Sequence, residues 1–298
     1  MHIRISKSLR TRLAFAALLA SPVILYAGFG SDEFDESTTT SEDDTLDWPE
    51  VSFPASEQRG SGFQSGEQFT YRAQWGIFRK AGKIKVSTDQ LADETGDTPL
   101  FSVKLDTRSD GLIRRIYPLT LISNTTLDAE NWRIIRDEVD EKVRSKTSRT
   151  LALFDYEENI VDYSDEEDPE RNKTRQIPYD VALDYASFIL QMRGWEMNIG
   201  ERYSSCVSTR GKFYFVEMQA MEVETIKTEF GKIDCIRVEP VQVYPESKTL
   251  REGGKMAVWY TADDDRVPVR FDVKTSVGTA SIRLEDFTLA QPENLAQR

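Results

Sequence analysis

The chain has 298 residues, with 51 acidic against 38 basic side chains, a formal net charge of −13 and a single histidine, His2. Such an acidic chain repels phosphate backbones and contains no Lys/Arg run of useful length, so we expect no nucleic acid partner and no polybasic membrane binding. Because His2 lies in an expected leader, imidazole catalysis is excluded, and we predict no catalytic residue, no metal ligand and no cofactor.

The first 27 residues have the layout of a secretory signal peptide. Four cations, Arg4, Lys7, Arg10 and Arg12, precede the apolar run 13–27, and no acid lies among them. Cleavage after Ala27 would lower the net charge from −13 to −17 and predicts a periplasmic protein. The alternative is an uncleaved membrane anchor over 13–29, a stretch somewhat shorter than the roughly 20 residues that span a bilayer.

Residues 28–65 are predicted to be a disordered acidic linker. The segment 31–50 combines acids with Ser and Thr and offers little to bury. The glycines of 59–66 match neither of the phosphate-binding spacings, and a strand follows them. We therefore expect a single β-rich domain over 66–290 and a C-terminal tail over 291–298.

A period of two dominates the chain from Gly66 onward. Phe69, Tyr71, Ala73 and Trp75 alternate with polar residues, which predicts a half-buried strand that pairs with 83–88 across a turn at 76–82. Further strands are predicted over 100–106, 119–127, 132–139, 149–156, 212–218, 221–228, 232–243, 255–261, 267–274 and 280–289. The fold class is therefore mainly β, an antiparallel, strongly curved sheet or open β-barrel.

One segment, 181–195, has helical periodicity instead. Val181, Tyr185, Phe188 and Trp195 recur at helical spacing, and Asp180 precedes them as a candidate N-cap. We predict one helix of about four turns, packed on the sheet.

Four stretches resemble a known family. They are GEQFTYRAQWGIFRKAGKIKV (66–86), the IPYD before the helix (177–180), TEFGKIDCIRVEP (228–240) and GGKMAVWYTADDDRVPVRFDVKTSVGTASIRLEDF (253–287). In this order and spacing they are similar to the bacterial envelope family catalogued as domain of unknown function 3108. The resemblance implies an exported, largely β protein of Gram-negative bacteria, and it brings no activity and no catalytic residues.

Two cysteines, Cys206 and Cys235, are present. An oxidising periplasm permits a disulfide between them, and two buried, inert thiols are the alternative. The acidic clusters 137–141, 165–168 and 263–265 are expected on solvated turns or polar faces, and the last lacks the spacing of a calcium loop.

The candidate ligand-binding residues are Tyr71, Trp75, Arg114 and Trp259. Aromatic rings with a few polar groups line pockets for lipids and glycans, although alternating aromatics on strands also form sheet cores. We expect a non-enzymatic periplasmic protein that binds or carries an amphiphilic or glycan-like envelope ligand. One alternative is an interaction or assembly factor with an envelope protein as partner, and another is a polysaccharide hydrolase that uses two carboxylates.

Overall fold

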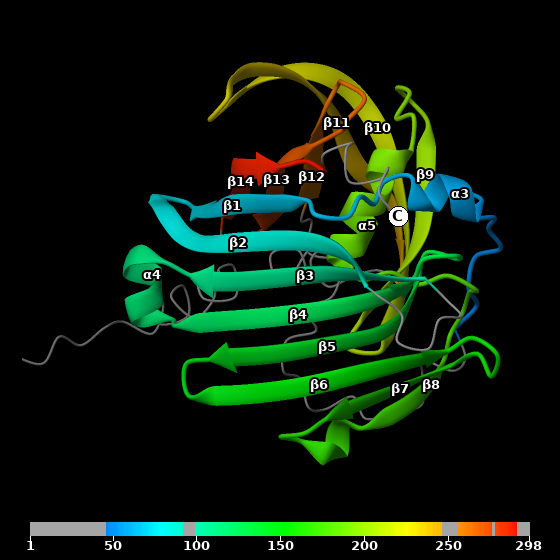
Figure 1. The fold of residues 1–298 in the computed structure, drawn as a ribbon. Helices are drawn as coiled ribbons and strands as arrows, with labels where there is room; N and C mark the ends of the chain where they lie inside the picture. The colour runs from blue at the N-terminus through cyan, green and yellow to red at the C-terminus, as the bar shows by residue number, and fades with distance from the viewer. Residues whose placement is uncertain (1–45, 92–98, 246–254, 276–277, 291–298) are drawn as a thin grey trace, which may run out of the picture.

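The computed structural model describes residues 46–91, 99–245, 255–275 and 278–290. In these ranges fourteen strands form one antiparallel sheet, curled into an open barrel (Figure 1). The expected fold class is confirmed. The strands are β1 (Gln68–Trp75), β2 (Phe78–Leu91), β3 (Leu100–Ser109), β4 (Leu119–Asp128), β5 (Arg133–Val143), β6 (Lys146–Asp155), β7 (Ile160–Asp165), β8 (Lys173–Gln176), β9 (Arg202–Thr209), β10 (Lys212–Thr228), β11 (Gly231–Tyr244), β12 (Lys255–Thr261), β13 (Pro268–Thr275) and β14 (Gly278–Thr288).

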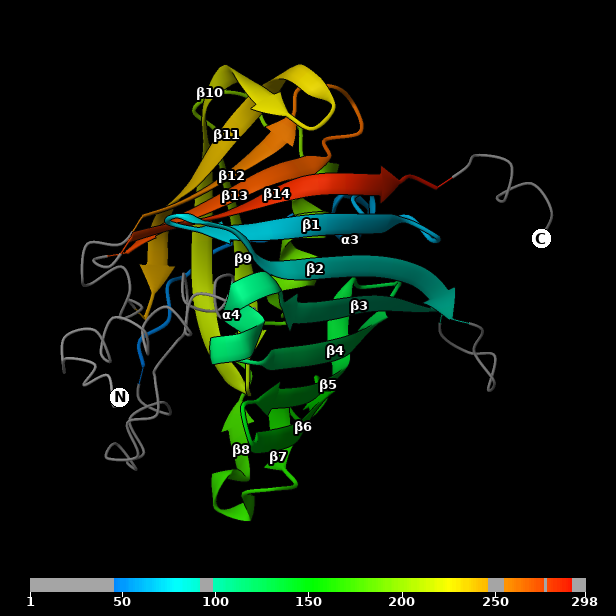
Figure 2. The ribbon, with the colours of Figure 1, turned by 90° about the vertical axis from the view of Figure 1, so that its left-hand side faces the viewer.

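The sheet consists of two meanders joined along β1 and β14. Strands β1 to β8 follow one another on one side of this seam, and β14 back to β9 follow on the other side (Figure 2). The curl brings the two far edges of the sheet together. Arg175 of β8 donates to the carbonyl oxygen of Gly211, which lies between β9 and β10, at 3.3 Å. Gly211 has a φ of +67°, and a Cβ there would lie 2.8 Å from that of Tyr163, so glycine permits this approach.

Alternation along the strands separates a buried from an exposed face. In β1 the side chains of Phe69, Tyr71 and Ala73 are buried, and Phe101, Val103 and Leu105 repeat the pattern in β3. The inward side chains of both meanders form one core.

Helix α5 (Tyr185–Gln191) lies inside this curl, and all seven of its residues are buried. The single-turn η3 (Met192–Gly194) continues it. Two expectations were wrong here: the helix is shorter than four turns, and its N-cap is Asp184, whose carboxylate accepts from the amides of Ala186 and Ser187.

The preceding residues are extended because neighbouring strands take their backbone groups. Ile134 donates to the carbonyl oxygen of Ala182 at 2.9 Å, and Leu183 donates to that of Cys206 at 3.0 Å. A helix over the same residues would give up these bonds.

Among the described residues, two further short helices lie outside the barrel. They are α3 (Ser56–Gly60) and α4 (Gly111–Ile116), and a single 3₁₀ turn, η2 (Pro169–Arg171), joins β7 to β8.

Part of the expected linker packs on the barrel. The ring of Phe63 stacks on Trp132 at 4.8 Å, and that of Phe53 meets Tyr179 edge-on at 5.1 Å. The Arg59 guanidinium donates to the carbonyl oxygens of Asn131 and Pro54. Residues 46–65 are therefore bound to the domain, whereas the expected signal peptide, the rest of the linker and the tail over 291–298 lie outside the described residues.

Some strand boundaries also differ from those expected. The first hairpin turns at Gly76 and Ile77 instead of over 76–82, and the two strands expected over 212–218 and 221–228 form the single strand β10. Strands β7, β8 and β9 were not predicted. Asp165, expected on a solvated connection, ends β7 and is buried.

The possible disulfide does not form. Cys206 pairs in register with Phe215 of β10, whereas Cys235 pairs with Glu224, nine residues further along the same strand. At about 3.3 Å per residue this separates the cysteines by about 30 Å, and a disulfide needs Cα atoms within about 7 Å. Both thiols are free and buried, and burial raises the pKa of the Cys235 thiol to about 11.

Candidate functional site

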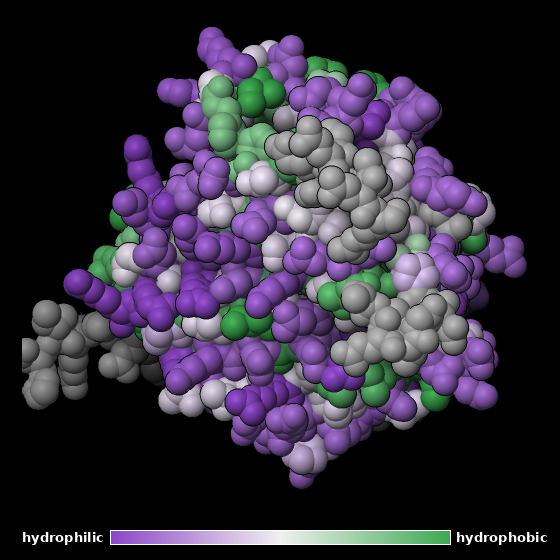
Figure 3. All heavy atoms as spheres, in the orientation of Figure 1, coloured by the Kyte–Doolittle hydropathy of each residue, from purple (hydrophilic) through white to green (hydrophobic). Residues whose placement is uncertain are grey.

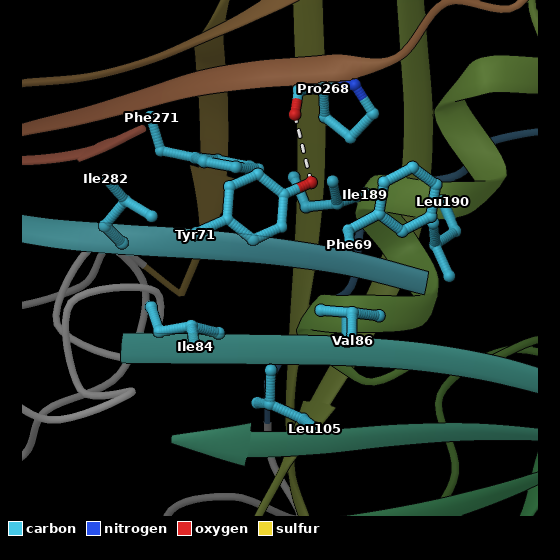
Figure 4. Close-up of a pocket in the computed structure, with 11 residues that line it drawn as sticks. Phe69, Tyr71, Ile84, Val86, Leu105, Ile189, Leu190, Pro268, Phe271 and Ile282 are labelled. Atoms are coloured by element: carbon cyan, nitrogen blue, oxygen red, sulfur yellow. Dashed lines mark hydrogen bonds between the residues drawn. The ribbon is translucent and has the colours of Figure 1, made fainter. Parts of the chain in front are cut away.

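The interior of the barrel contains a small apolar cavity between α5 and the strands around the β1–β14 seam (Figure 4). The space open to the centre of a water-sized sphere is about 30 Å³. The cavity is lined by Phe69, Tyr71, Ile84, Val86, Leu105, Ala186, Ile189, Leu190, Pro268, Phe271 and Ile282. Strands of both meanders and the inner helix therefore all contribute to its wall.

Tyr71 supplies the one side-chain polar atom of the wall. Its hydroxyl donates to the carbonyl oxygen of Pro268 at 3.0 Å, as the dashed line in Figure 4 shows. Burial raises the pKa of this phenol well above its usual value, so the group stays neutral. The cavity therefore presents carbon atoms to whatever occupies it.

The other candidate residues do not join Tyr71. Trp259 lies on the outer face of β12, where its indole nitrogen donates to Glu224 at 3.2 Å and the Arg270 guanidinium lies 4.6 Å from its ring. The Trp259 side chain is buried there, only 6% exposed, and is not part of the cavity wall.

Trp75 and Arg114 lie together at a third place, the corner formed by α4 and the first hairpin. Trp75 stacks on Phe78 at 6.1 Å, and both pack against the buried Ile113 of α4. Arg114 is exposed and donates to the carbonyl oxygen of Ser109 at 3.4 Å. The structure thus brings two of the four candidates together, outside the barrel.

Two carboxyl groups are buried inside the barrel near the start of α5. Asp137 of β5 accepts from the hydroxyls of Ser123 and Thr125, each at 3.2 Å, and Asp184 caps the helix. Burial, together with the charge of Asp184, raises the pKa of Asp137 to about 7. Burial also raises the pKa of Asp184. The expectation that Asp137 lies on a solvated face was wrong.

A buried ion pair fixes the C-terminal end of the inner helix. Arg193 of η3 makes two bonds to Glu67, at 2.6 and 2.9 Å, and the side chains are 3% and 0% exposed. Arg193 also donates to the carbonyl oxygen of Asp265 at 3.1 Å. With both groups paired and satisfied, the pair positions the helix beside β1.

Sequence reasoning missed most of the cavity wall. Ile84 and Leu105 could have been found as inward positions of alternating strands, but the same signal marks every core residue. Ala186 had no signal, because its small side chain leaves space only after the helix is placed. No group of three or more acidic, cysteine or histidine side chains that could hold a metal ion occurs within the described ranges.

Fold and site together define a curled antiparallel barrel with a helix inside it and an apolar interior. The chain belongs to the family described as "Protein of unknown function (DUF3108)", whose model matches residues 70–285, so the resemblance in sequence is confirmed. No curated protein matches the chain.

Solved structures that are similar to this chain match it at low identity. A β-barrel-like protein of the domain of unknown function DUF1849 from Brucella abortus is 9% identical, with a TM-score of 0.48 over 76% of this chain and 98% of that one. A protein of Bacteroides fragilis, provisionally described as exported and with a YmcC-like fold, is 12% identical, with a TM-score of 0.30 over 80% and 98%. None of the helices in the described ranges has the length and apolar composition of a membrane span.

Proposed function

We propose that this is a non-enzymatic periplasmic protein that binds the alkyl portion of an amphiphilic envelope ligand in the apolar cavity. The observation that carries the proposal is the cavity wall, whose one side-chain polar atom, the Tyr71 hydroxyl, is already bonded to Pro268. The periplasmic location rests on the signal-like segment 1–27.

The chemistry of the cavity favours an apolar occupant over water. A buried water needs two to four polar partners and roughly 10–15 Å³, so the volume of about 30 Å³ would suffice but the partners are missing. An alkyl group gains about 0.8 kcal/mol for each buried methylene. In this conformation the space fits the end of a chain, and a longer chain requires an outward shift of α5.

The hydrolase alternative fits the interior less well. A glycosidase needs its two carboxyl groups to flank a sugar in a cleft. Asp137 and Asp184 are buried and already bonded to hydroxyls of β4 and to the first amides of α5. We therefore assign both to the structure of the barrel.

The proposal is tested by calorimetric titration of the purified protein with decanoate below its micellar concentration. Ala186→Leu fills the cavity from the helix and Leu105→Phe fills it from β3, and each should weaken binding about tenfold or more, because two or three methylenes lose their place. Trp259→Phe on the outer face should leave binding unchanged. Equal affinity in all four proteins, each with retained thermal stability, would reject the cavity as the site.

A further inference from the structure

Cations from three separate turns gather at one end of the barrel. Arg79 and Lys80 follow the β1–β2 turn, Arg114 and Arg115 lie on α4, and Arg144 lies in the β5–β6 turn. All five are exposed. We name these five residues, with the apolar residues Ile77, Leu112 and Ile116, the basic edge.

Short contacts hold these turns together. The amide of Asp110, the N-cap of α4, donates to the carbonyl oxygen of Ala81 in β2 at 2.9 Å. The Arg144 guanidinium lies 4.8 Å from the ring centre of Tyr117, directly after α4. The three turns that carry the basic edge therefore lie side by side at the α4 end of the barrel (Figures 1 and 2).

The apolar members of the basic edge are unusually exposed. Ile77 is 89% exposed, Leu112 52% and Ile116 42%. They are neighbours in the chain of Trp75, Phe78 and Ile113, whose side chains pack together. This packing keeps the turn and α4 in place while the three apolar side chains stay exposed. Figure 3 shows apolar atoms at this end of the molecule, bordered by hydrophilic ones.

The cations of the basic edge are not neutralised by neighbours. Within the described residues, none of the five has a carboxylate at ion-pair distance, whereas the nearby acids are already engaged. Asp110 pairs with Arg72 at 3.4 Å and Glu141 with Arg210 at 2.6 Å. A local positive surface therefore exists on a chain whose net charge is −13.

The opposite end of the barrel carries the reverse charge. Its turns present Glu157 and Glu158 between β6 and β7, and Asp263, Asp264 and Asp265 between β12 and β13, all exposed. The α4 end also carries the exposed Glu166, Glu167 and Glu170 of the β7–β8 turn, so an anionic surface would attract the basic edge itself and repel both this turn and the opposite end.

We propose that the basic edge docks on the surface of an anionic lipid bilayer, with the cations at the headgroup phosphates and Ile77, Leu112 and Ile116 in the interface. Exposed apolar side chains ringed by cations fit a bilayer better than a polar polyanion, which offers no apolar layer. This docking is independent of the cavity proposal. It departs from the expectation of no polybasic membrane binding, which rested on the acidic net charge of the whole chain and on the lack of Lys/Arg runs, and not on cations gathered by the fold.

The test places a reporter on the basic edge of the full chain. The native thiols of Cys206 and Cys235 are buried, so an environment-sensitive dye attached to Ile77→Cys reports on one site. Vesicles of phosphatidylcholine with 30% phosphatidylglycerol should shift the dye emission to the blue, and pure phosphatidylcholine vesicles should not. The matched control is Ile199→Cys, which is 52% exposed next to β9 at the opposite end, and its dye should not respond.

Charge removal supplies the second arm. Arg114→Gln with Arg115→Gln, in the Ile77→Cys background, should lower the partition into anionic vesicles about tenfold or more while the melting temperature is retained. The N-terminal segment is the same in every variant, so it cannot produce this difference. A dye response that is absent, equal for both vesicle types or unchanged by the Gln variant would overturn the proposal. Binding of dextran sulfate, together with no emission shift in the presence of anionic vesicles, would also overturn the proposal, because the basic edge would then bind a polyanion and not a bilayer.

Discussion

At the scale of single residues, the least expected feature is Asp137, which lies inside the barrel. Counting by twos from the buried Ile134 would place residue 137 outside. A β-bulge opposite Thr126 and Leu127 inserts one extra residue in β5, so the inward positions change from even to odd numbers after it. A sequence pattern alone does not locate such a bulge, because the insertion depends on the partner strand.

The raised pKa of Asp137 has a definite consequence for stability. The folded protein holds this proton up to a pKa of about 7, whereas an unfolded aspartate releases it near pH 4. Between these values the folded state binds more protons, so the free energy of unfolding falls as pH rises. We expect the melting temperature of the native protein to decrease between about pH 4 and 7, beyond the general effect of its many acids.

Asp137→Asn should remove this part of the pH dependence and raise the melting temperature at pH 7 to 8. Asp140→Asn, on the same strand with a side chain 64% exposed, is the matched control and should follow the native curve. Circular dichroism melts at several pH values measure all three proteins. Parallel curves for the native protein and Asp137→Asn would show that Asp137 ionises normally in the fold.

At the scale of elements, the inner helix shows how tertiary contacts override local signals. The apolar periodicity of 181–195 correctly predicted burial, and Tyr185, Phe188 and Trp195 are all core residues. The start of the helix was wrong, because residues 181–183 bond to β5 and β9 instead of forming a helical turn. Both Asp180 and Asp184 have a side chain that can cap a helix. The helix begins after Asp184 because the intervening backbone bonds to the neighbouring strands β5 and β9.

This choice predicts unequal effects for two aspartates four residues apart. Asp184→Ala removes the acceptor for two buried amides at 3.0 and 3.2 Å and should lower the free energy of unfolding by about 1–2 kcal/mol. Asp180→Ala, at an exposed site, should change it by less than about 0.5 kcal/mol. Urea unfolding at pH 8 measures both variants. An equal loss in both would mean that the helix begins near Asp180.

At the scale of the whole molecule, the strand register keeps the two cysteines far apart in the sheet. One sequence cannot tell that a single long strand, β10, separates them by nine positions. We expect the purified protein to react with two equivalents of thiol reagent after denaturation without reductant. Its melting temperature should not change when reductant is added. A mass lower by two hydrogens, together with a melting temperature that falls when reductant is added, would show a disulfide. That result would contradict the registers of β9 and β11 on β10.

The local features could be predicted from the amino-acid sequence: the alternating strands, the mainly β fold class, the buried helical segment and the membership of the family. These follow from the side-chain period of each element, which is encoded by residues close together in the chain. Four features became known only from the three-dimensional arrangement: the closure of the sheet, the cavity beside Ala186, the inward orientation of Asp137 and the gathering of cations on the basic edge. These depend on strand register, on one bulge and on the curl of fourteen strands, which bring together residues far apart in the sequence.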